Sequence, residues 1–256
     1  IIGIGASAGG LEALTQFVSH LHPNFAGSII VAQHLAPKAK SMMTELLGRQ
    51  THINITTATN GQKLEPGVVY IIPPNVDAEI QSDEIILTEA GPETRPKPSV
   101  DTLFSSLARV YGNRAFGVIL SGTGTDGSEG VRAIRAAGGV TIAQDAQSAK
   151  YDGMPTSAVQ TGSVDSILAP ESIGENIDSI IENHFARMST KFVEDDHLPQ
   201  VLEILRSKGR DFTEYKPSTI RRRLAKRLGT LGLKSTADYL EVLKKTPGEI
   251  AALSQE

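Results

Sequence analysis

Cysteine is absent from all 256 residues, which excludes disulfide bonds and thiolate chemistry and fits a cytoplasmic location. No apolar run reaches the length of about 18 residues that a transmembrane helix needs, and no charged segment precedes an apolar run as in a signal peptide. The net charge of −4 is too small to indicate bulk nucleic-acid binding, and the HExxH motif of a metal site is missing. We therefore expect a cytoplasmic protein without a nucleic-acid partner, membrane insertion or bound metal.

Charge is distributed unevenly along the chain. Residues 1–187 carry 12 Lys or Arg against 19 Asp or Glu, whereas residues 188–256 carry 13 against 10. The balance changes near ARMSTKFVEDDHLP, a segment without apolar periodicity that is typical of a linker. We expect one domain over residues 1–187, a linker over 188–196 and a second domain over 197–256. Because the sequence opens inside an expected strand, we also expect it to be part of a longer chain.

Short apolar strands alternate with helical patterns before the linker. IIGIGA, SIIVAQ, AFGVIL and GVTIAQ are apolar on both faces, which predicts an α/β fold with a doubly wound, mainly parallel sheet. In the middle, GVVYIIPP, AEIQ and EIILTE predict a β-hairpin insertion at the sheet edge, and Ser99 is expected to cap a helix that ends near Tyr111. Beyond the linker, leucines at helical spacing predict a small all-α domain.

The opening stretch IIGIGASAGG fits two different motifs. Gly3, Gly5 and Ala8 fit the G-x-G-x-x-A pattern of dinucleotide-binding loops, while the same loop fits the G-x-S-x-G nucleophile turn centred on Ser7. A dinucleotide site needs an acidic residue about 20 positions further on to bind the ribose. Residues 13–44 contain no Asp or Glu, which is evidence against a nucleotide-dependent oxidoreductase.

A serine nucleophile needs a base and a group that orients the base. Ser7, His34 and Asp126 each follow an expected strand, and the carboxyl ends of parallel strands meet at one edge of the sheet. Each alone has a plainer interpretation, as a helix cap, a hydrogen-bonded strand end or a turn residue. Their conjunction favours a serine hydrolase, and the chain order Ser, His, Asp differs from that of α/β-hydrolases.

Seven segments resemble the catalytic domain of CheB protein-glutamate methylesterases over about residues 1–187: GASAGG, VAQHLAP, PGVVYIIPP, PSVDTLF, GVILSGTGTDGSEG, TIAQDAQSAKYDGMP and TGSVDSIL. The resemblance implies hydrolysis of methyl esters on glutamate side chains of bacterial chemoreceptors, often with deamidation of receptor glutamines. It implies methylated receptor helices as the partner and no cofactor. The family's catalytic Ser, His and Asp fall on Ser7, His34 and Asp126.

Further site residues are expected around this triad. Backbone N–H groups near Ala8 and Thr123 are expected to hold the oxyanion, and the loop with Tyr151 and Met154 either lines the receptor groove or forms a plain turn. The sequence departs from the family at Ala8, where Thr is common, and at Thr123 and Thr125, where Met and Asn are common. These departures leave open a second hypothesis, a catalytically silent module that regulates a fused methyltransferase.

The tail resembles the N-terminal helical domain of CheR methyltransferases over about residues 197–256, through DFTEYKPSTIRRRLAKRLGTLGLKSTADYLEVLKKTPGE. The sequence is therefore similar to the front part of a CheB–CheR fusion. S-adenosylmethionine would belong to the transferase domain, which is not in this sequence. Arg221, Arg222 and Arg223 lie on a basic helix with three interpretations: a solvated face, a weakly supported nucleic-acid site, or a surface for an acidic receptor helix or the transferase site. The resemblance favours the third.

Overall fold

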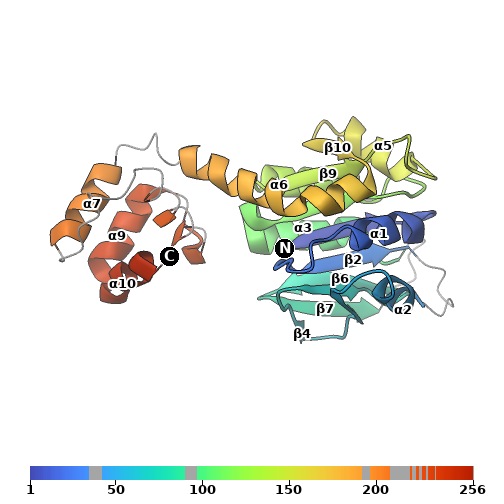
Figure 1. Ribbon diagram of the computed structural model, residues 1–256, viewed down its shortest axis with the longest axis horizontal. Helices are drawn as coiled ribbons and strands as arrows, with labels where there is room; N and C mark the ends of the chain where they lie inside the picture. The colour runs from blue at the N-terminus through green and yellow to red at the C-terminus, as the bar shows by residue number, and fades with distance from the viewer. Residues whose placement is uncertain are drawn as a thin grey trace. The chain divides into compact units, whose positions relative to one another are not determined.

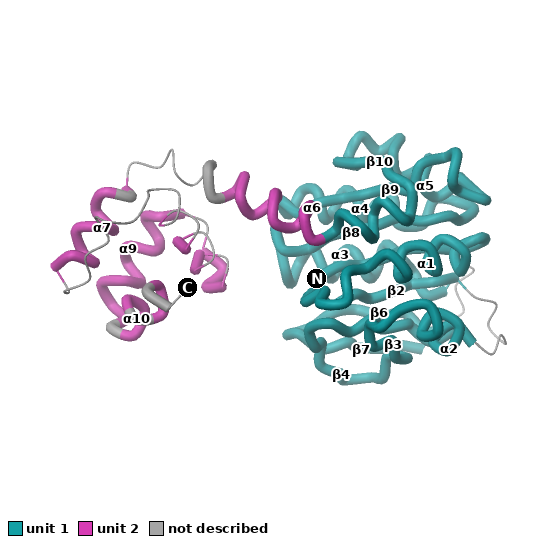
Figure 2. Tube along the Cα trace, in the orientation of Figure 1, with its two compact units in different colours: residues 1–177 teal, residues 178–256 magenta. Residues whose placement is uncertain are grey.

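The computed structural model describes residues 1–34, 42–89, 97–191, 197–207, 220, 223–224, 227–228, 230–233 and 235–255 (Figure 1). The chain divides into two compact units, residues 1–177 and 178–256, which are coloured separately in Figure 2. Each unit has its own hydrophobic core and is described by itself.

A parallel sheet forms the centre of the first unit. In the described part of the chain its seven strands lie in the order β10-β9-β8-β1-β2-β5-β3, and every pairing between them is parallel. The strands are β1 (Ile2–Ala6), β2 (Ile29–Gln33), β3 (Asn54–Thr57), β5 (Val68–Ile71), β8 (Phe116–Ile119), β9 (Val140–Gln144) and β10 (Ser166–Leu168). The chain runs outward from β1 first through β2 and later through β8, so β1 lies at the point where strand order reverses. Ligand sites of open parallel sheets lie at such switch points.

Helices cover both faces of this sheet, which confirms the predicted doubly wound α/β class (Figure 1). They are α1 (Gly10–Ser19), α2 (Met43–Gly48), α3 (Val100–Tyr111), the short 3₁₀ helix η1 (Gly112–Arg114), α4 (Ser128–Ala136), α5 (Gly153–Gln160) and α6 (Pro170–Lys191). Ser99 caps α3 as predicted, because its Oγ accepts a hydrogen bond from the Thr102 amide. Gly3 lets α3 approach β1 closely, since a Cβ there would lie 2.6 Å from Leu107 Cδ1.

The predicted hairpin insertion forms a separate antiparallel sheet. Its strands are β4 (Gln62–Lys63), β6 (Val76–Gln81) and β7 (Glu84–Glu89), in the order β4-β7-β6. Ser82 and Asp83 have positive φ values of 47° and 68°, as a two-residue primed turn requires. The expectation that GVVYIIPP belongs to this insertion was wrong. Its buried residues form β5, which pairs with β2 and β3 in the central sheet because both of its faces are covered.

The second unit is helical where it is described, with α7 (Leu198–Ser207), α9 (Thr236–Lys245) and α10 (Pro247–Gln255). Its core is apolar, as the leucines at helical spacing predicted, and consists of Val201, Leu205, Ile220, Leu224, Leu228, Tyr239, Leu240, Leu243 and Leu253. Helix α6 continues to Lys191, past the boundary expected at residue 187. The segment ARMSTK was expected to belong to the linker because it lacks apolar periodicity. Its Ala, Arg, Met and Lys residues nevertheless have high intrinsic helix propensity, which is consistent with the longer helix.

Candidate active site

A tight turn joins β1 to α1 and carries Ser7. Gly9 has φ 74°, a left-handed conformation that favours glycine, and a Cβ there would lie 2.6 Å from Ser121 Oγ. The Ser7 amide donates to Ser121 O over 2.9 Å, and the Gly10 amide donates to Ser7 O over 2.9 Å. Ser7 therefore sits in the strand–turn–helix context that a nucleophile turn requires.

His34 lies beside Ser7 on the neighbouring strand. Ala6 pairs with Gln33 in the parallel register of β1 and β2, so Ser7 and His34 are the next residues on the two chains. The His34 amide donates to Ala6 O over 2.9 Å, which extends the ladder past the last strand residue. Backbone pairing thus brings together two residues that are 27 positions apart in the sequence.

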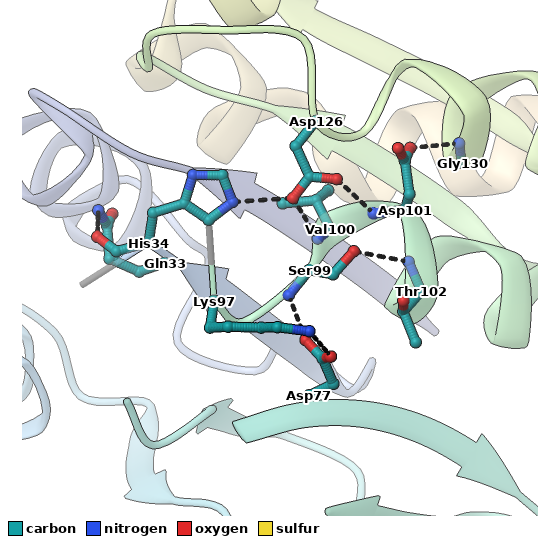
Figure 3. A network of polar contacts seen from close by, with 10 residues as sticks. All are labelled: Gln33, His34, Asp77, Lys97, Ser99, Val100, Asp101, Thr102, Asp126 and Gly130. Atoms are coloured by element: carbon teal, nitrogen blue, oxygen red, sulfur yellow. Dashed lines mark hydrogen bonds and ion pairs between the residues drawn. The ribbon is translucent and has the colours of Figure 1, made fainter. Parts of the chain in front are cut away.

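Asp126 comes from the opposite side of β1, in the loop between β8 and α4. His34 Nε2 lies 2.8 Å from Asp126 Oδ2, and the two side chains are only 8% and 16% exposed (Figure 3). The same carboxylate accepts the Val100 amide at 2.8 Å and the Asp101 amide at 3.0 Å. Asp126 therefore caps the first turn of α3 while it holds the imidazole ring.

These contacts keep Asp126 ionised. Burial acts to raise the pKa of Asp126, but the hydrogen bonds from His34 and from the amides of Val100 and Asp101 outweigh it and hold the pKa below its usual value. Asp101 behaves in the opposite way. Burial and the nearby Asp126 charge raise the pKa of Asp101, against the Gly130 amide that donates to its Oδ1 over 2.8 Å.

A half-buried ion pair anchors the segment that enters α3. Asp77 at the start of the hairpin pairs with Lys97 through Oδ2 and accepts the Ser99 amide at 2.7 Å through Oδ1 (Figure 3). Ser99 then caps the same helix end whose first amides hold Asp126. The hairpin, α3 and the Asp126 carboxylate are thus linked by a continuous set of hydrogen bonds.

A base, a nucleophile and several backbone amides at this edge remain available for acyl transfer. Since Nε2 of His34 pairs with Asp126, Nδ1 is the ring nitrogen left to take a proton from Ser7. In the described residues neither that nitrogen nor Ser7 Oγ has a hydrogen-bond partner, as is common before substrate binds. The amides of Ala8, Gly9 and Thr123 also have no acceptor within the described part of the chain, so they are candidates to hold an oxyanion.

The loop before α5 differs from the expectation. Tyr151 is 44% exposed, whereas Met154 is buried in the core under Gly122 and belongs to the first turn of α5. The Gly122 amide donates to Tyr151 O and the Met154 amide to Gly122 O, each over 2.8 Å. Of the two side chains named from the sequence, Tyr151 is the one open to solvent. The Met154 side chain supports the Thr123 loop from within.

Two buried polar residues at this edge had no role assigned from the sequence. Gln33 Nε2 donates to Ser7 O at 2.7 Å and to His34 O at 3.1 Å. Ser121 Oγ donates to Ala8 O at 2.8 Å. Both residues stand inside motifs next to the triad, VAQHLAP and SGTGTDG, and that adjacency was the available signal.

The remaining predictions concern the basic helix, a metal site and membrane insertion. Arg221 and Arg222 lie outside the described residues, and Arg223 is half-buried in the helical unit. Among the residues with described positions, no group of three or more His, Asp or Glu side chains is placed to hold a metal ion. No helix in the described ranges is both long and apolar enough to cross a membrane.

Comparison with known proteins assigns the first unit to a protein family. Residues 2–177 match the family described as CheB methylesterase. The chain belongs to this family. Residues 200–256 match the all-alpha domain of CheR methyltransferases, so the predicted order of the two segments is confirmed.

Relatives and a solved structure agree with this assignment. A Rhizobium meliloti protein named protein-glutamate methylesterase/protein-glutamine glutaminase is 36% identical over 181 residues, covering 70% of this chain and 51% of that protein. A 104.1 kDa uncharacterised protein of Rhodobacter capsulatus is 35% identical over 240 residues, 84% of this chain and 25% of its own length. The chain thus spans between a quarter and about half of these two relatives. The crystal structure of the Thermotoga maritima CheB methylesterase catalytic domain superposes with a TM-score of 0.65 at 29% identity, covering 71% of this chain and 96% of that one.

Proposed function

We propose that residues 1–177 form a serine hydrolase that removes methyl groups from glutamate methyl esters on the cytoplasmic helices of chemoreceptors. The observation that carries this proposal is the register of Ser7 beside His34, together with the 2.8 Å bond from His34 to Asp126. Family membership and the names of the relatives support the substrate class. The protein would act in the cytoplasm, where these receptor helices lie.

The reaction follows the acyl-transfer sequence. Ser7 Oγ attacks the ester carbonyl carbon while His34 Nδ1 takes its proton, and the carbonyl oxygen becomes an oxyanion held by backbone amides. The tetrahedral intermediate collapses, its C–O bond to the methoxy group breaks, and His34 returns the proton to release methanol. Water then attacks the acyl-enzyme with His34 as base, which frees Ser7 and leaves a glutamate carboxylate. A glutamine side chain would follow the same course with ammonia as the leaving group.

This chemistry requires no metal and no organic cofactor, because the chain supplies nucleophile, base and oxyanion donors. We propose that S-adenosylmethionine binds to a methyltransferase catalytic domain and not to the helices of residues 200–256, which match the all-alpha part. Titration of S-adenosylmethionine into a protein of residues 1–256, followed by calorimetry, should show no binding. Saturable heat at micromolar ligand would contradict this assignment.

Methanol release from fully methylated receptor membranes tests the proposal. The chain should release methanol, and Ser7→Ala should reduce release to the uncatalysed background. Ser19→Ala is a matched control, since that exposed hydroxyl at the end of α1 contacts Gln16 O and His20 Nδ1 within its own helix end. A folded wild-type chain that releases no more methanol than Ser7→Ala would contradict the esterase and support the silent regulatory module.

A further inference from the structure

The two peptide groups that follow Ser7 are each held by a buried side chain from a neighbouring strand end. Gln33, the last residue of β2, donates through Nε2 to Ser7 O over 2.7 Å. Ser121, just after β8, donates through Oγ to Ala8 O over 2.8 Å. Their exposed fractions are 4% and 1%, so solvent competes little for these bonds. Because β2 and β8 flank β1, the turn that carries Ser7 accepts hydrogen bonds from the strands on both sides.

These two hydrogen bonds also fix the direction of the Ala8 and Gly9 N–H groups, because each peptide group is planar and trans. The C=O of one residue and the N–H of the following residue point in opposite directions within one peptide plane. Fixing Ser7 O toward the buried Gln33 therefore turns the Ala8 N–H outward, and fixing Ala8 O on Ser121 turns the Gly9 N–H away from that hydroxyl. Neither amide is used by another described group.

The contacts of the Gln33 side chain indicate that its Nε2 donor group holds the turn. Nε2 also reaches His34 O at 3.1 Å, whereas Oε1 is buried without a hydrogen-bond partner in the described residues. The amide group packs against the Cα of Gly10, where a side chain would clash with it. A glutamate would be acceptor-only when ionised and would face two carbonyl oxygens. The position thus requires a neutral donor of this length.

We propose that Gln33 and Ser121 are positioning residues that preset the Ala8 and Gly9 amides as oxyanion donors. The inference rests on the proposed esterase function and adds the device that orients its oxyanion site. Among the described groups, Ser7 O without the Gln33 bond keeps the Gly10 amide as its donor, and Ala8 O without the Ser121 bond loses its side-chain donor. Each peptide is then held less firmly in the orientation that presents its N–H to the oxyanion. The oxyanion forms only after the ester has bound, so loss of its donors should lower kcat and leave KM unchanged.

Substitution of each residue tests the device in the full chain. Gln33→Met keeps the length of the side chain and removes its donors, and we expect kcat for methanol release to fall about 10- to 100-fold with KM within about twofold. Ser121→Ala removes a single hydroxyl and should change kcat in the same direction. Ser28→Ala is the matched control, since Ser28 is buried at the opposite end of β2 and, among the described residues, its hydroxyl donates to Glu65 O alone. It should leave both constants unchanged.

A second readout keeps the inference separate from the proposed function. In ¹⁵N-labelled protein, Gln33→Met should shift the Ala8 amide resonance and Ser121→Ala that of Gly9, with Ser28→Ala affecting neither. If wild-type protein releases no methanol, the esterase proposal fails, and these resonances alone decide the inference. Unchanged resonances in folded variants, or an equal loss of kcat in Ser28→Ala, would overturn it.

Discussion

Asp126 binds His34 Nε2 at 2.8 Å through Oδ2, the oxygen that also accepts the Val100 amide of α3 at 2.8 Å. One carboxylate therefore orients the proposed catalytic base and caps a helix. The orientation of the imidazole depends on where α3 begins, and the start of α3 depends on the hairpin through Asp77 and Ser99. Activity and local stability are coupled at this edge of the sheet.

Asp126→Asn should separate these two roles. An amide can still accept one bond at this position, but it cannot stabilise the imidazolium, so we expect kcat to fall about 10³- to 10⁴-fold. Loss of the charge from the N-terminus of α3 should lower the free energy of unfolding by about 1 kcal/mol. Methanol release and urea unfolding measure the two effects. Asp165→Asn is a control in which a carboxylate also accepts a backbone amide, from Thr141, away from the triad; an equal loss of kcat there would contradict a specific role for Asp126.

Asp77→Ala should weaken the anchor of α3. The substitution leaves Lys97 without this carboxylate in a site where its side chain is 13% exposed, and we expect a cost of about 2 kcal/mol of unfolding free energy, between the values typical of exposed and of buried pairs. We expect a smaller fall in kcat, roughly fivefold, because Asp126 retains its own amide donors. As a control, Glu79→Ala removes the largely exposed ion pair that joins β6 to Arg109 of α3, and it should cost less than about 1 kcal/mol. Equal destabilisation by both variants in urea unfolding would refute the anchor.

Gly122→Ala should displace the nucleophile. A Cβ at this position would lie 2.8 Å from Ser7 Cβ and would also overlap the Met154 sulfur. The Met154 side chain can move, whereas the backbone bonds of the turn resist movement of Ser7, so we expect kcat to fall at least about tenfold. Gly48→Ala at the end of α2 places its methyl in open space and should retain full activity. Wild-type kcat in folded Gly122→Ala would show that the contact is relieved without cost to the site.

Glu249→Gln should change the acid stability of the helical unit. Hydrogen bonds from Arg227 at 2.6 and 2.7 Å, with a further one from Tyr239, lower the pKa of Glu249 against the effect of burial. A lowered pKa stabilises the fold above the usual Glu value of 4.5, and this contribution is lost as the pH falls through the folded-state value. The variant should lose about 3 kcal/mol near neutral pH and less in acid.

Thermal unfolding of the full chain followed by Tyr239 resonances measures this pH dependence. Glu241→Gln serves as control, because Glu241 makes only surface pairs with Lys244 and Lys245. It should leave the unfolding temperature of the helical unit nearly unchanged at every pH. A constant difference between Glu249→Gln and wild type from neutral to acid pH would refute the assignment.

The triad could be predicted from the sequence because parallel strands obey a simple geometric rule. Residues directly after apolar strands gather at one sheet edge, so Ser7, His34 and Asp126 could be grouped before any contact was known. The α/β class followed from strands that are apolar on both faces. The antiparallel hairpin was predicted from the short strands AEIQ and EIILTE.

Other features depended on contacts between distant segments. The sequence pattern did not reveal that β5 belongs to the central sheet, since a short apolar strand looks alike in either sheet. Nor did it show that Met154 is buried under Gly122 while Tyr151 faces solvent.

Local pattern thus determines which residues end strands and which faces are apolar, because both depend on neighbours in the chain. Three sets of hydrogen bonds came only from the folded structure. They join His34 Nε2 to Asp126, the first amides of α3 to Asp126, and Gln33 Nε2 to the Ser7 carbonyl. A buried hydrogen bond joins groups that packing brings within about 3 Å, and packing is set by elements far apart in sequence.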